Sequence, residues 1–160
     1  MKRDKVLKML EVAQDYANQN SKCKKVAVGS VICINDKDSF VIYGANTTLP
    51  GNCIECGCQR EKLYGENSKE HRLPSDCRAV HSEIDAICGA ARFGMPVKNS
   101  SIVITRYPCE ACARAIVRAG ISKVYYGRQQ EISEQTQKIF EEGNVSVEWV
   151  KEWKYEDTTQ

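Results

Sequence analysis

The sequence has no apolar run long enough to cross a membrane, and its N-terminus lacks the apolar core of a secretory signal. It also has little excess charge, because 23 basic and 21 acidic residues leave a formal net charge of +2. A nucleic-acid-binding surface favours a basic stripe and a pI above about 9, whereas the pI here is about 8.0. We therefore expect a cytoplasmic protein with no membrane contact, and a nucleic-acid partner is disfavoured.

Internal repeats and low-complexity segments are also absent from the 160 residues. Hydrophobic residues make up 42% and charged residues 28%, a balance typical of a globular protein with one core. We assign residues 1–155 to a single domain and residues 156–160 to a frayed tail.

Hydrophobic periodicity divides most of the chain into helices and strands. The predicted helices span residues 4–19, 78–92, 109–119 and 133–142. The predicted strands span residues 26–34, 40–45, 101–105, 123–126 and 145–150. A polar turn at 35–39 joins the first two strands into a hairpin. Strands that alternate with helices indicate an α/β protein with helices layered on a sheet.

One long segment, residues 46–79, interrupts this pattern. It has no hydrophobic periodicity up to about residue 76, and it contains prolines, glycines and several cysteines. A loop of this length without regular structure is uncommon in a compact domain unless it is functional or braced. We therefore predict an extended loop that is held by some additional interaction.

The nine cysteines need a reason in a protein of a reducing compartment. They are Cys23, Cys33, Cys53, Cys56, Cys58, Cys77, Cys88, Cys109 and Cys112. Their odd number and the lack of a secretory signal argue against a disulfide framework. Cys33 and Cys88 lie in apolar patterns and are explained as small buried side chains. Cys53, Cys56 and Cys58 cluster in a polar segment, where that explanation fits poorly.

Two short stretches contain the residues that indicate chemistry: His81-Ser82-Glu83 and Pro108-Cys109-Glu110-Ala111-Cys112. Together they match the H-x-E…P-C-x-x-C signature of zinc deaminases. Cys109 and Cys112 lie one helical turn apart, so they project from the same face, and a helix N-terminus favours the thiolate form. With His81 they supply three zinc ligands and leave the fourth tetrahedral position for the water molecule that zinc activates.

Glu83 follows His81 by two residues, which keeps its carboxylate off the metal but near the cavity. A carboxylate there can take a proton from water and deliver it to a ring nitrogen and a leaving amine. The predicted reaction is hydrolytic attack on an amidine-like carbon of an aminopyrimidine or aminopurine, with release of ammonia. Either motif alone is weak, since a lone C-x-x-C is often redox-active or half of a structural zinc site.

Around these motifs, over residues 23–127, the sequence resembles the cytidine and deoxycytidylate deaminase superfamily, and within it the deoxycytidylate (dCMP) deaminases. The matching segments are residues 28–32, 44–46, 50–51, 77–83, 90–94, 105, 108–109, 119–121 and 124–126. The resemblance implies a three-layer α/β/α fold with a five-stranded mixed sheet. It also implies a zinc cofactor, a nucleotide substrate converted from dCMP to dUMP, and a homo-oligomer.

The resemblance also implies roles for two residues of the substrate pocket. Asn46 matches an asparagine that contacts the sugar, and Arg92 matches an arginine that binds phosphate or stabilises a subunit contact. The segment 44–51 lacks the tyrosine and the second glycine of the family's regulatory loop, which puts nucleotide regulation in doubt. Ser82 and Asp85 replace the usual alanine and asparagine, and the acid could change the preference for base or phosphate.

Some bacterial and phage dCMP deaminases carry a second, structural zinc that braces the loop before the catalytic histidine. The residues that match its ligands are Cys23, Cys53, Cys58, His71 and Cys77, with Cys56 as an extra candidate. The fourth ligand, Cys58 or His71, stays open. Metal ligation can hold a segment that buries little apolar surface, so this ion would explain how residues 46–76 stay ordered.

Three other functions compete with deamination of dCMP. The enzyme could act on a base within tRNA or single-stranded DNA, which needs a basic and often aromatic path for the strand. It could deaminate a free nucleoside or base, which needs no phosphate site. A non-catalytic zinc scaffold is the remaining alternative, and Glu83 argues against it because a structural site has no use for that carboxylate.

Overall fold

The computed structural model describes residues 1–23, 25–34, 40–48, 53–65, 77–129 and 133–155. The helices are α1 (Arg3–Asn20), α2 (Cys53–Cys56), α3 (Gln59–Tyr64), α4 (Ser82–Arg92), α5 (Glu110–Arg118) and α6 (Glu134–Glu142). The strands are β1 (Gly29–Cys33), β2 (Val41–Ala45), β3 (Thr47–Thr48), β4 (Ala79–Val80), β5 (Ser101–Arg106), β6 (Lys123–Arg128) and β7 (Ser146–Trp149). No helix among the described residues is both long and apolar enough to cross a membrane.

The main sheet has five strands in the order β2-β1-β5-β6-β7. Strand β1 pairs antiparallel with β2 and with β5, whereas β5, β6 and β7 run parallel. The hairpin predicted for the first two strands is therefore confirmed, and so is the five-stranded mixed sheet. Its turn, residues 35–39, lies outside the described residues.

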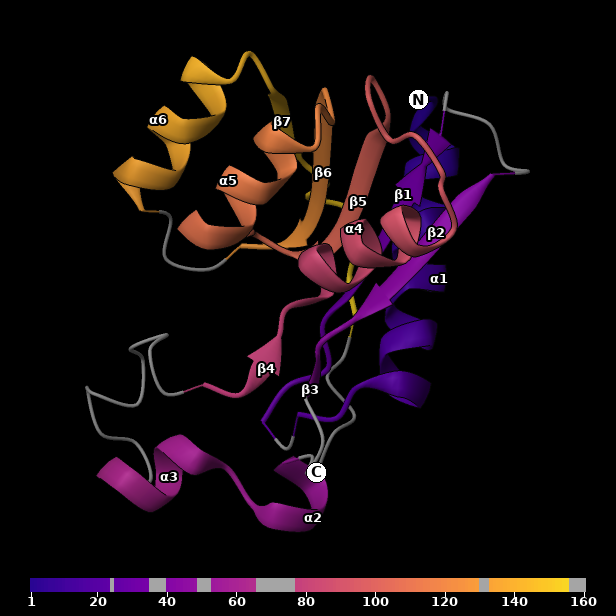
Figure 1. Cartoon of the computed structure of the whole chain (residues 1–160). Helices are drawn as coiled ribbons and strands as arrows, with labels where there is room; N and C mark the ends of the chain where they lie inside the picture. Colours follow the sequence, from indigo (N-terminus) through magenta and orange to yellow (C-terminus); the bar gives the residue numbers. More distant parts are fainter. Residues whose placement is uncertain (24, 35–39, 49–52, 66–76, 130–132, 156–160) are drawn as a thin grey trace.

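Helices cover both faces of this sheet (Figure 1). On one face α1 packs on a core that includes Leu10, Val31 and Val103. On the other face α4, α5 and α6 enclose a second core, which includes Ile102 and Ile104 of β5. The two cores use alternate residues of the same strand because successive side chains of a strand point to opposite faces. The three-layer α/β/α architecture is thus confirmed.

Helix α4 lies unusually close to strand β2. A Cβ atom added to Gly44 would stand 2.1 Å from the backbone oxygen of Ser82 and 2.7 Å from the backbone nitrogen of Ala86. Only glycine leaves room for this backbone-to-backbone approach. The first turn of α4 is thereby held directly on the sheet.

The segment 46–79 contains more regular structure than the sequence predicted. Strands β3 and β4 form a two-stranded sheet, with Thr47 opposite Val80, and helices α2 and α3 lie between them in sequence. Figure 1 shows this insert projecting away from the main sheet. An ion pair between Lys25 and Glu61 ties α3 to the segment before β1. Elements this short do not produce a readable periodicity, so the expectation of an extended loop was wrong in part.

Two predicted helix starts also shift. The helix expected over 78–92 begins at Ser82, because Ala79 and Val80 belong to β4 and His81 is the N-cap with an extended backbone. The helix expected at Cys109 begins one residue later, with Cys109 as its N-cap. Both predicted metal-binding motifs therefore lie at the N-terminus of a helix that follows a strand.

Candidate active site

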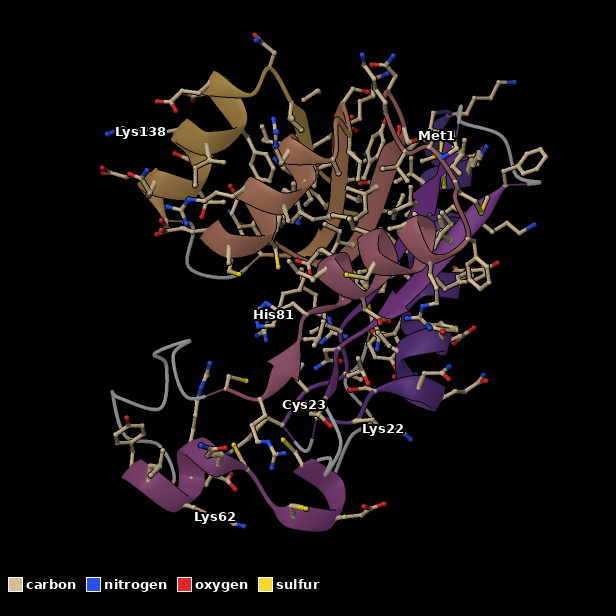
Figure 2. All side chains as sticks on the ribbon, in the orientation of Figure 1. Met1, Lys22, Cys23, Lys62, His81 and Lys138 are labelled. Carbon is tan, nitrogen blue, oxygen red and sulfur yellow. The ribbon has the colours of Figure 1, made fainter. Side chains whose placement is uncertain are left out.

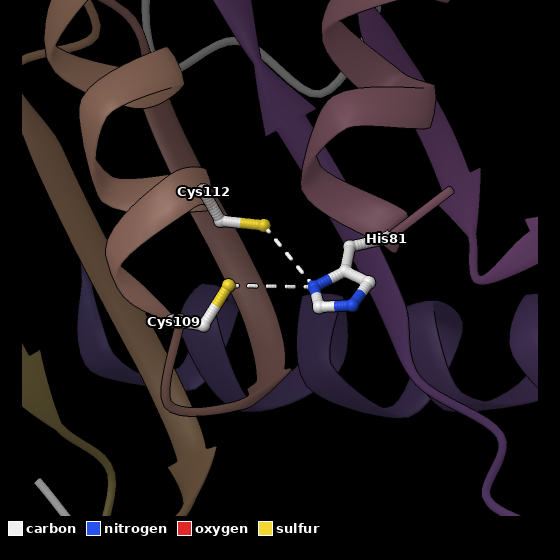
Figure 3. Close-up of side chains that lie close together, drawn as sticks. All are labelled: His81, Cys109 and Cys112. Atoms are coloured by element: carbon white, nitrogen blue, oxygen red, sulfur yellow. Dashed lines mark hydrogen bonds between the residues drawn. The ribbon is translucent and has the colours of Figure 1, made fainter. Parts of the chain in front are cut away.

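Three side chains converge between the N-termini of α4 and α5. His81 caps α4, Cys109 caps α5, and Cys112 lies in the first turn of α5. Figure 3 shows both cysteines pointing toward the ring of His81. The two helices bring together residues that are 28 and 31 positions apart in the sequence.

The spacing of these three side chains fits a zinc ion. The Nδ1 atom of His81 lies 3.4 Å from the Sγ of Cys109 and 3.4 Å from the Sγ of Cys112. A tetrahedral zinc with ordinary Zn–N and Zn–S distances holds nitrogen and sulfur about 3.5 Å apart. Among the described residues, this is the one group of three histidine, cysteine or acidic side chains whose ligand atoms all lie within 4.8 Å.

The two thiols of this cluster differ in their proton affinity. A hydrogen bond from Cys112, assisted by one from His81, lowers the pKa of Cys109 to about 3. The same bond to Cys109, together with burial, raises the pKa of Cys112. The hydrogen bond with Cys109 also raises the pKa of His81. The opposite pKa shifts of Cys109 and Cys112 have the same physical cause, the close approach of the two side chains at the centre of the cluster.

Glu83 is buried beside this cluster, at 4% exposure, in the first turn of α4. Its Oε2 accepts a hydrogen bond from the hydroxyl of Ser82 at 3.1 Å. After the hydrogen bond with Cys109 and burial, the carboxylate of Glu83 adds to the raised pKa of Cys112. Burial raises the pKa of Glu83 above its usual range, which suits a carboxyl group that both takes up and gives back a proton.

A cavity of about 590 Å³ adjoins the cluster. Its walls are Cys77, Ala79, Val80, His81, Ile84, Pro108, Cys109, Glu110, Ala111, Cys112, Arg114, Ser133 and Thr136. Cavities of roughly 300–1,000 Å³ are the usual size for small-molecule sites. Glu110 is fixed in its wall by a hydrogen bond from Ser133 at 3.0 Å and by Arg114 at 3.5 Å.

Asn46, predicted to contact a sugar, follows β2 and forms hydrogen bonds with the segment between α1 and β1. It is 5% exposed. Its Oδ1 accepts from the hydroxyl of Ser21 at 2.7 Å and from the backbone nitrogen of Val28 at 2.9 Å. Its Nδ2 donates to the carbonyl of Val26 at 2.7 Å. An amide has two N–H donors, so one of them is not engaged in these contacts with the described residues.

Two further residues from the sequence prediction lie elsewhere on α4. Arg92 is exposed and ends the helix, and eleven residues place it roughly 16 Å along the axis from the end that carries His81. Asp85 accepts a hydrogen bond from the backbone nitrogen of Ala45 at 3.1 Å. The structure therefore does not bring Arg92 to the cluster, and Asp85 ties α4 to the end of β2.

The cysteines predicted for a second metal gather around the insert. Cys53 is buried, and burial raises its pKa, with smaller contributions from the nearby thiols of Cys23, Cys58 and Cys77. Cys23 appears above the insert in Figure 2. Within the described ranges no three of these sulfur atoms reach the 4.8 Å spacing of the first cluster. Cys56 is exposed, and His71 lies outside the described residues.

Arg60 is a further charged residue whose relation to the cluster is not evident from the sequence. This residue belongs to α3 of the insert, and its guanidinium is close enough to His81 to oppose the larger effect of Cys109 on the pKa of that histidine. No sequence pattern pointed to it, because the short helices of the insert gave no periodicity. Its positive charge therefore acts electrostatically on His81.

The grouping of one histidine, two cysteines and a buried glutamate where two helix N-termini face each other matches the arrangement described for zinc deaminases. Residues 3–128 match the family model described as the cytidine and deoxycytidylate deaminase zinc-binding region, and the chain belongs to this family.

Several proteins of known name are similar in sequence. The deoxycytidylate deaminase of Enterobacteria phage T2 is 35% identical, and the match covers 74% of this chain and 77% of the phage protein. ComE operon protein 2 of Bacillus subtilis is 31% identical over 82% of this chain. The match spans 64% of the length of that Bacillus protein. Human deoxycytidylate deaminase is 30% identical over 68% of this chain and 56% of its own.

A solved structure has the same fold. It is the dCMP deaminase of cyanophage S-TIM5 in complex with dCMP and dUMP, with a TM-score of 0.69 and 24% identity. The match covers 93% of this chain and 98% of the cyanophage chain. It supports the fold prediction.

Proposed function

We propose that this protein is a zinc-dependent hydrolase that converts dCMP to dUMP and ammonia. The observation that carries the proposal is the His81/Cys109/Cys112 cluster with the buried carboxylate of Glu83 beside it. The relatives named deoxycytidylate deaminase support the choice of substrate.

In this proposal each residue of the cluster has one task. His81, Cys109 and Cys112 would hold a zinc ion, which would supply Lewis acidity that makes water a better nucleophile near neutral pH. Glu83 takes the proton of the attacking water and passes it to the ring nitrogen. The attacking oxygen is then a hydroxyl on the attacked carbon. The carboxylate takes the proton of that hydroxyl and delivers it to the amine, so that a carbonyl forms as the C–N bond breaks and ammonia leaves.

A phosphate-bearing substrate needs a positive charge near this centre. Arg60 is the candidate, because its charge acts on the pKa of His81 and a guanidinium suits phosphate by offering several N–H donors in one plane. The N–H of Asn46 that is not engaged in the contacts above is a candidate donor to the sugar. Arg92 is too far along α4 to reach the same cavity, so its proposed role is at a contact between subunits.

The central experiment compares wild-type protein with Glu83→Gln. We expect the substitution to lower kcat for dCMP at least about 100-fold, since general acid–base catalysis contributes that much, while the zinc content stays unchanged. Glu142→Gln, which removes a carboxylate from the exposed end of α6, serves as the matched control. Unchanged turnover by Glu83→Gln would overturn the role of Glu83.

A substrate panel separates the competing activities. Ammonia release is measured with dCMP, CMP, deoxycytidine, cytidine, guanine and a single-stranded oligonucleotide. Preference for dCMP supports the proposal. Turnover of another member of the panel, with none of dCMP, would replace the proposed substrate and keep the zinc chemistry.

We also propose a second, structural zinc near the insert, held by Cys23, Cys53 and Cys77 with Cys58 or His71. What supports it is the grouping of these thiols around the buried Cys53. The wild-type protein is expected to contain two zinc ions per chain and Cys53→Ser one, whereas Cys88→Ser, on the exposed side of α4, keeps both. One ion in the wild-type protein would refute the second site.

Finally, we propose that the protein is a cytoplasmic homo-oligomer. None of the nine cysteines, all of which lie among the described residues, forms a disulfide, and this supports a reducing compartment. Phe93 follows α4 and is 75% exposed, beside Arg92. Light scattering after gel filtration tests this proposal, and Phe93→Ser is expected to lower the molecular mass from that of an oligomer toward 18.0 kDa. A monomeric wild-type protein would contradict it.

A further inference from the structure

We propose that Ser82 is a positioning residue that holds the carboxylate of Glu83 in its working orientation. This inference rests on the proposed catalytic role of Glu83. The hydroxyl of Ser82 donates to the Oε2 of Glu83 at 3.1 Å. Ser82 is 0% exposed and Glu83 is 4% exposed, so water does not compete for this bond.

Ser82 is itself fixed by the sheet. Its backbone carbonyl accepts a hydrogen bond from the hydroxyl of Ser30 at 2.8 Å, and Ser30 lies on β1, where it pairs with Gly44 of β2 and with Ile104 of β5. The carbonyl also faces Gly44 of β2 at a separation that only glycine allows. The donor therefore stands on a rigid support that is built by two strands.

Ser82 is the first residue of α4, and its hydroxyl does not act as a helix cap. Serine at an N-cap accepts from backbone N–H groups, but the cap of α4 is His81, and Ser82 follows it. Its hydroxyl bonds the neighbouring carboxylate instead.

Fixing one carboxylate oxygen has a direct consequence for proton transfer. A free glutamate side chain samples many rotamers, and holding it in one of them costs conformational entropy. Ser82 binds Oε2 and restrains that freedom before substrate arrives. Oε1 is then presented in a defined direction for the proton, and general acid–base catalysis depends on such placement within hydrogen-bond reach.

The test compares Ser82→Ala with Ser100→Ala. Ser100 is also 0% exposed, and its hydroxyl has no hydrogen-bond partner among the described residues. It precedes β5, at the end of that strand opposite Cys109. Both variants lose one buried hydroxyl, but only Ser82→Ala loses the bond to Glu83.

We expect Ser82→Ala to lower kcat for dCMP about tenfold, with KM within about twofold of wild type and zinc content unchanged. Ser100→Ala keeps the wild-type kcat. Ser82→Thr, which retains the hydroxyl, restores kcat to within about threefold of wild type. If Ser82→Ala melts too early for assay, Ser82→Thr alone decides: near-wild-type kcat supports the proposal, and a tenfold loss in a folded variant overturns it.

A wild-type kcat in folded Ser82→Ala, or an effect confined to KM, overturns the positioning role. This failure is distinct from failure of the proposed function. In the first case wild-type protein deaminates dCMP and Ser82→Ala does so equally well. In the second case the wild-type protein does not deaminate dCMP at all.

Discussion

The close approach of β2 to α4 offers a sharp test of how the site is positioned. In Gly44→Ala the new methyl group would stand 2.1 Å from the carbonyl oxygen of Ser82 and 2.9 Å from the Cβ of Ala86. The first of these atoms is backbone, so no side-chain rotation can relieve the clash. Helix α4 has to move away from the sheet by about 1 Å, and Glu83 moves with it.

The size of the effect follows from that shift. Overpacking of a tight core costs about 1–3 kcal/mol, so we expect the free energy of unfolding to fall by about 2 kcal/mol. A misplacement of about 1 Å in a catalytic group can lower the rate about 100-fold. Loss of kcat for dCMP should therefore exceed what the loss of stability explains, since most Gly44→Ala protein is still folded at 25 °C.

Gly89→Ala is the matched control, because it adds a methyl group to the same helix. Its nearest neighbour would be the Cγ2 of Ile42 at 3.4 Å, an ordinary contact. Alanine favours a helix over glycine by about 1 kcal/mol, so this variant should melt at the wild-type temperature or above it and keep its kcat. Urea unfolding and steady-state kinetics on both variants provide the measurements. Wild-type stability and kcat in Gly44→Ala would refute the argument.

Three further outcomes are expected. Arg60→Ala should raise the KM for dCMP about tenfold and change the KM for deoxycytidine less than about twofold. Equal effects on the two substrates would show that Arg60 does not bind the phosphate. Ser133→Ala should lower the free energy of unfolding by about 1 kcal/mol in urea titrations, because its hydroxyl caps α6 by accepting from the nitrogen of Thr136 at 3.3 Å. Arg3 lowers the pKa of the Glu152 carboxyl from 4.5 to about 2. The destabilisation caused by Glu152→Gln should therefore be present at pH 7 and shrink as the pH falls through 4.5 toward 2. A difference in urea midpoint between the two proteins that is as large at pH 3 as at pH 7 would contradict this.

The main sheet and the grouping of His81, Cys109 and Cys112 could be predicted from sequence because both depend on local patterns. Alternation and helical spacing mark the long elements, and His81, Cys109 and Cys112 each lie next to the start of such a helix. The spacing of Cys109 and Cys112 also reports that they share a face. The α/β topology then brings the two helix starts together.

The remaining features depend on contacts that no local pattern records. Arg60 comes near His81 only through the folded insert, whose helices are too short to show periodicity. The orientation of the Asn46 amide is set by its hydrogen bonds to backbone groups of the segment before β1. The sequence does not report these contacts. Ser82 was noticed as a departure from the family, but its bond to Glu83 became visible only with the side chains in place.

The order of the strands has a consequence for folding. Strand β1 pairs with β5, with Val31 opposite Val103, so the chain between them, including the insert and α4, must close as one long loop. Pairings this distant in sequence form slowly. His81 lies within that loop and Cys109 beyond it, so their cluster cannot assemble before the loop closes. A metal ion that binds only the closed chain draws the equilibrium toward the native state, by about 4 kcal/mol at a thousand times its Kd. Metal supply during synthesis would then govern how much native protein accumulates, as well as how much of it is active.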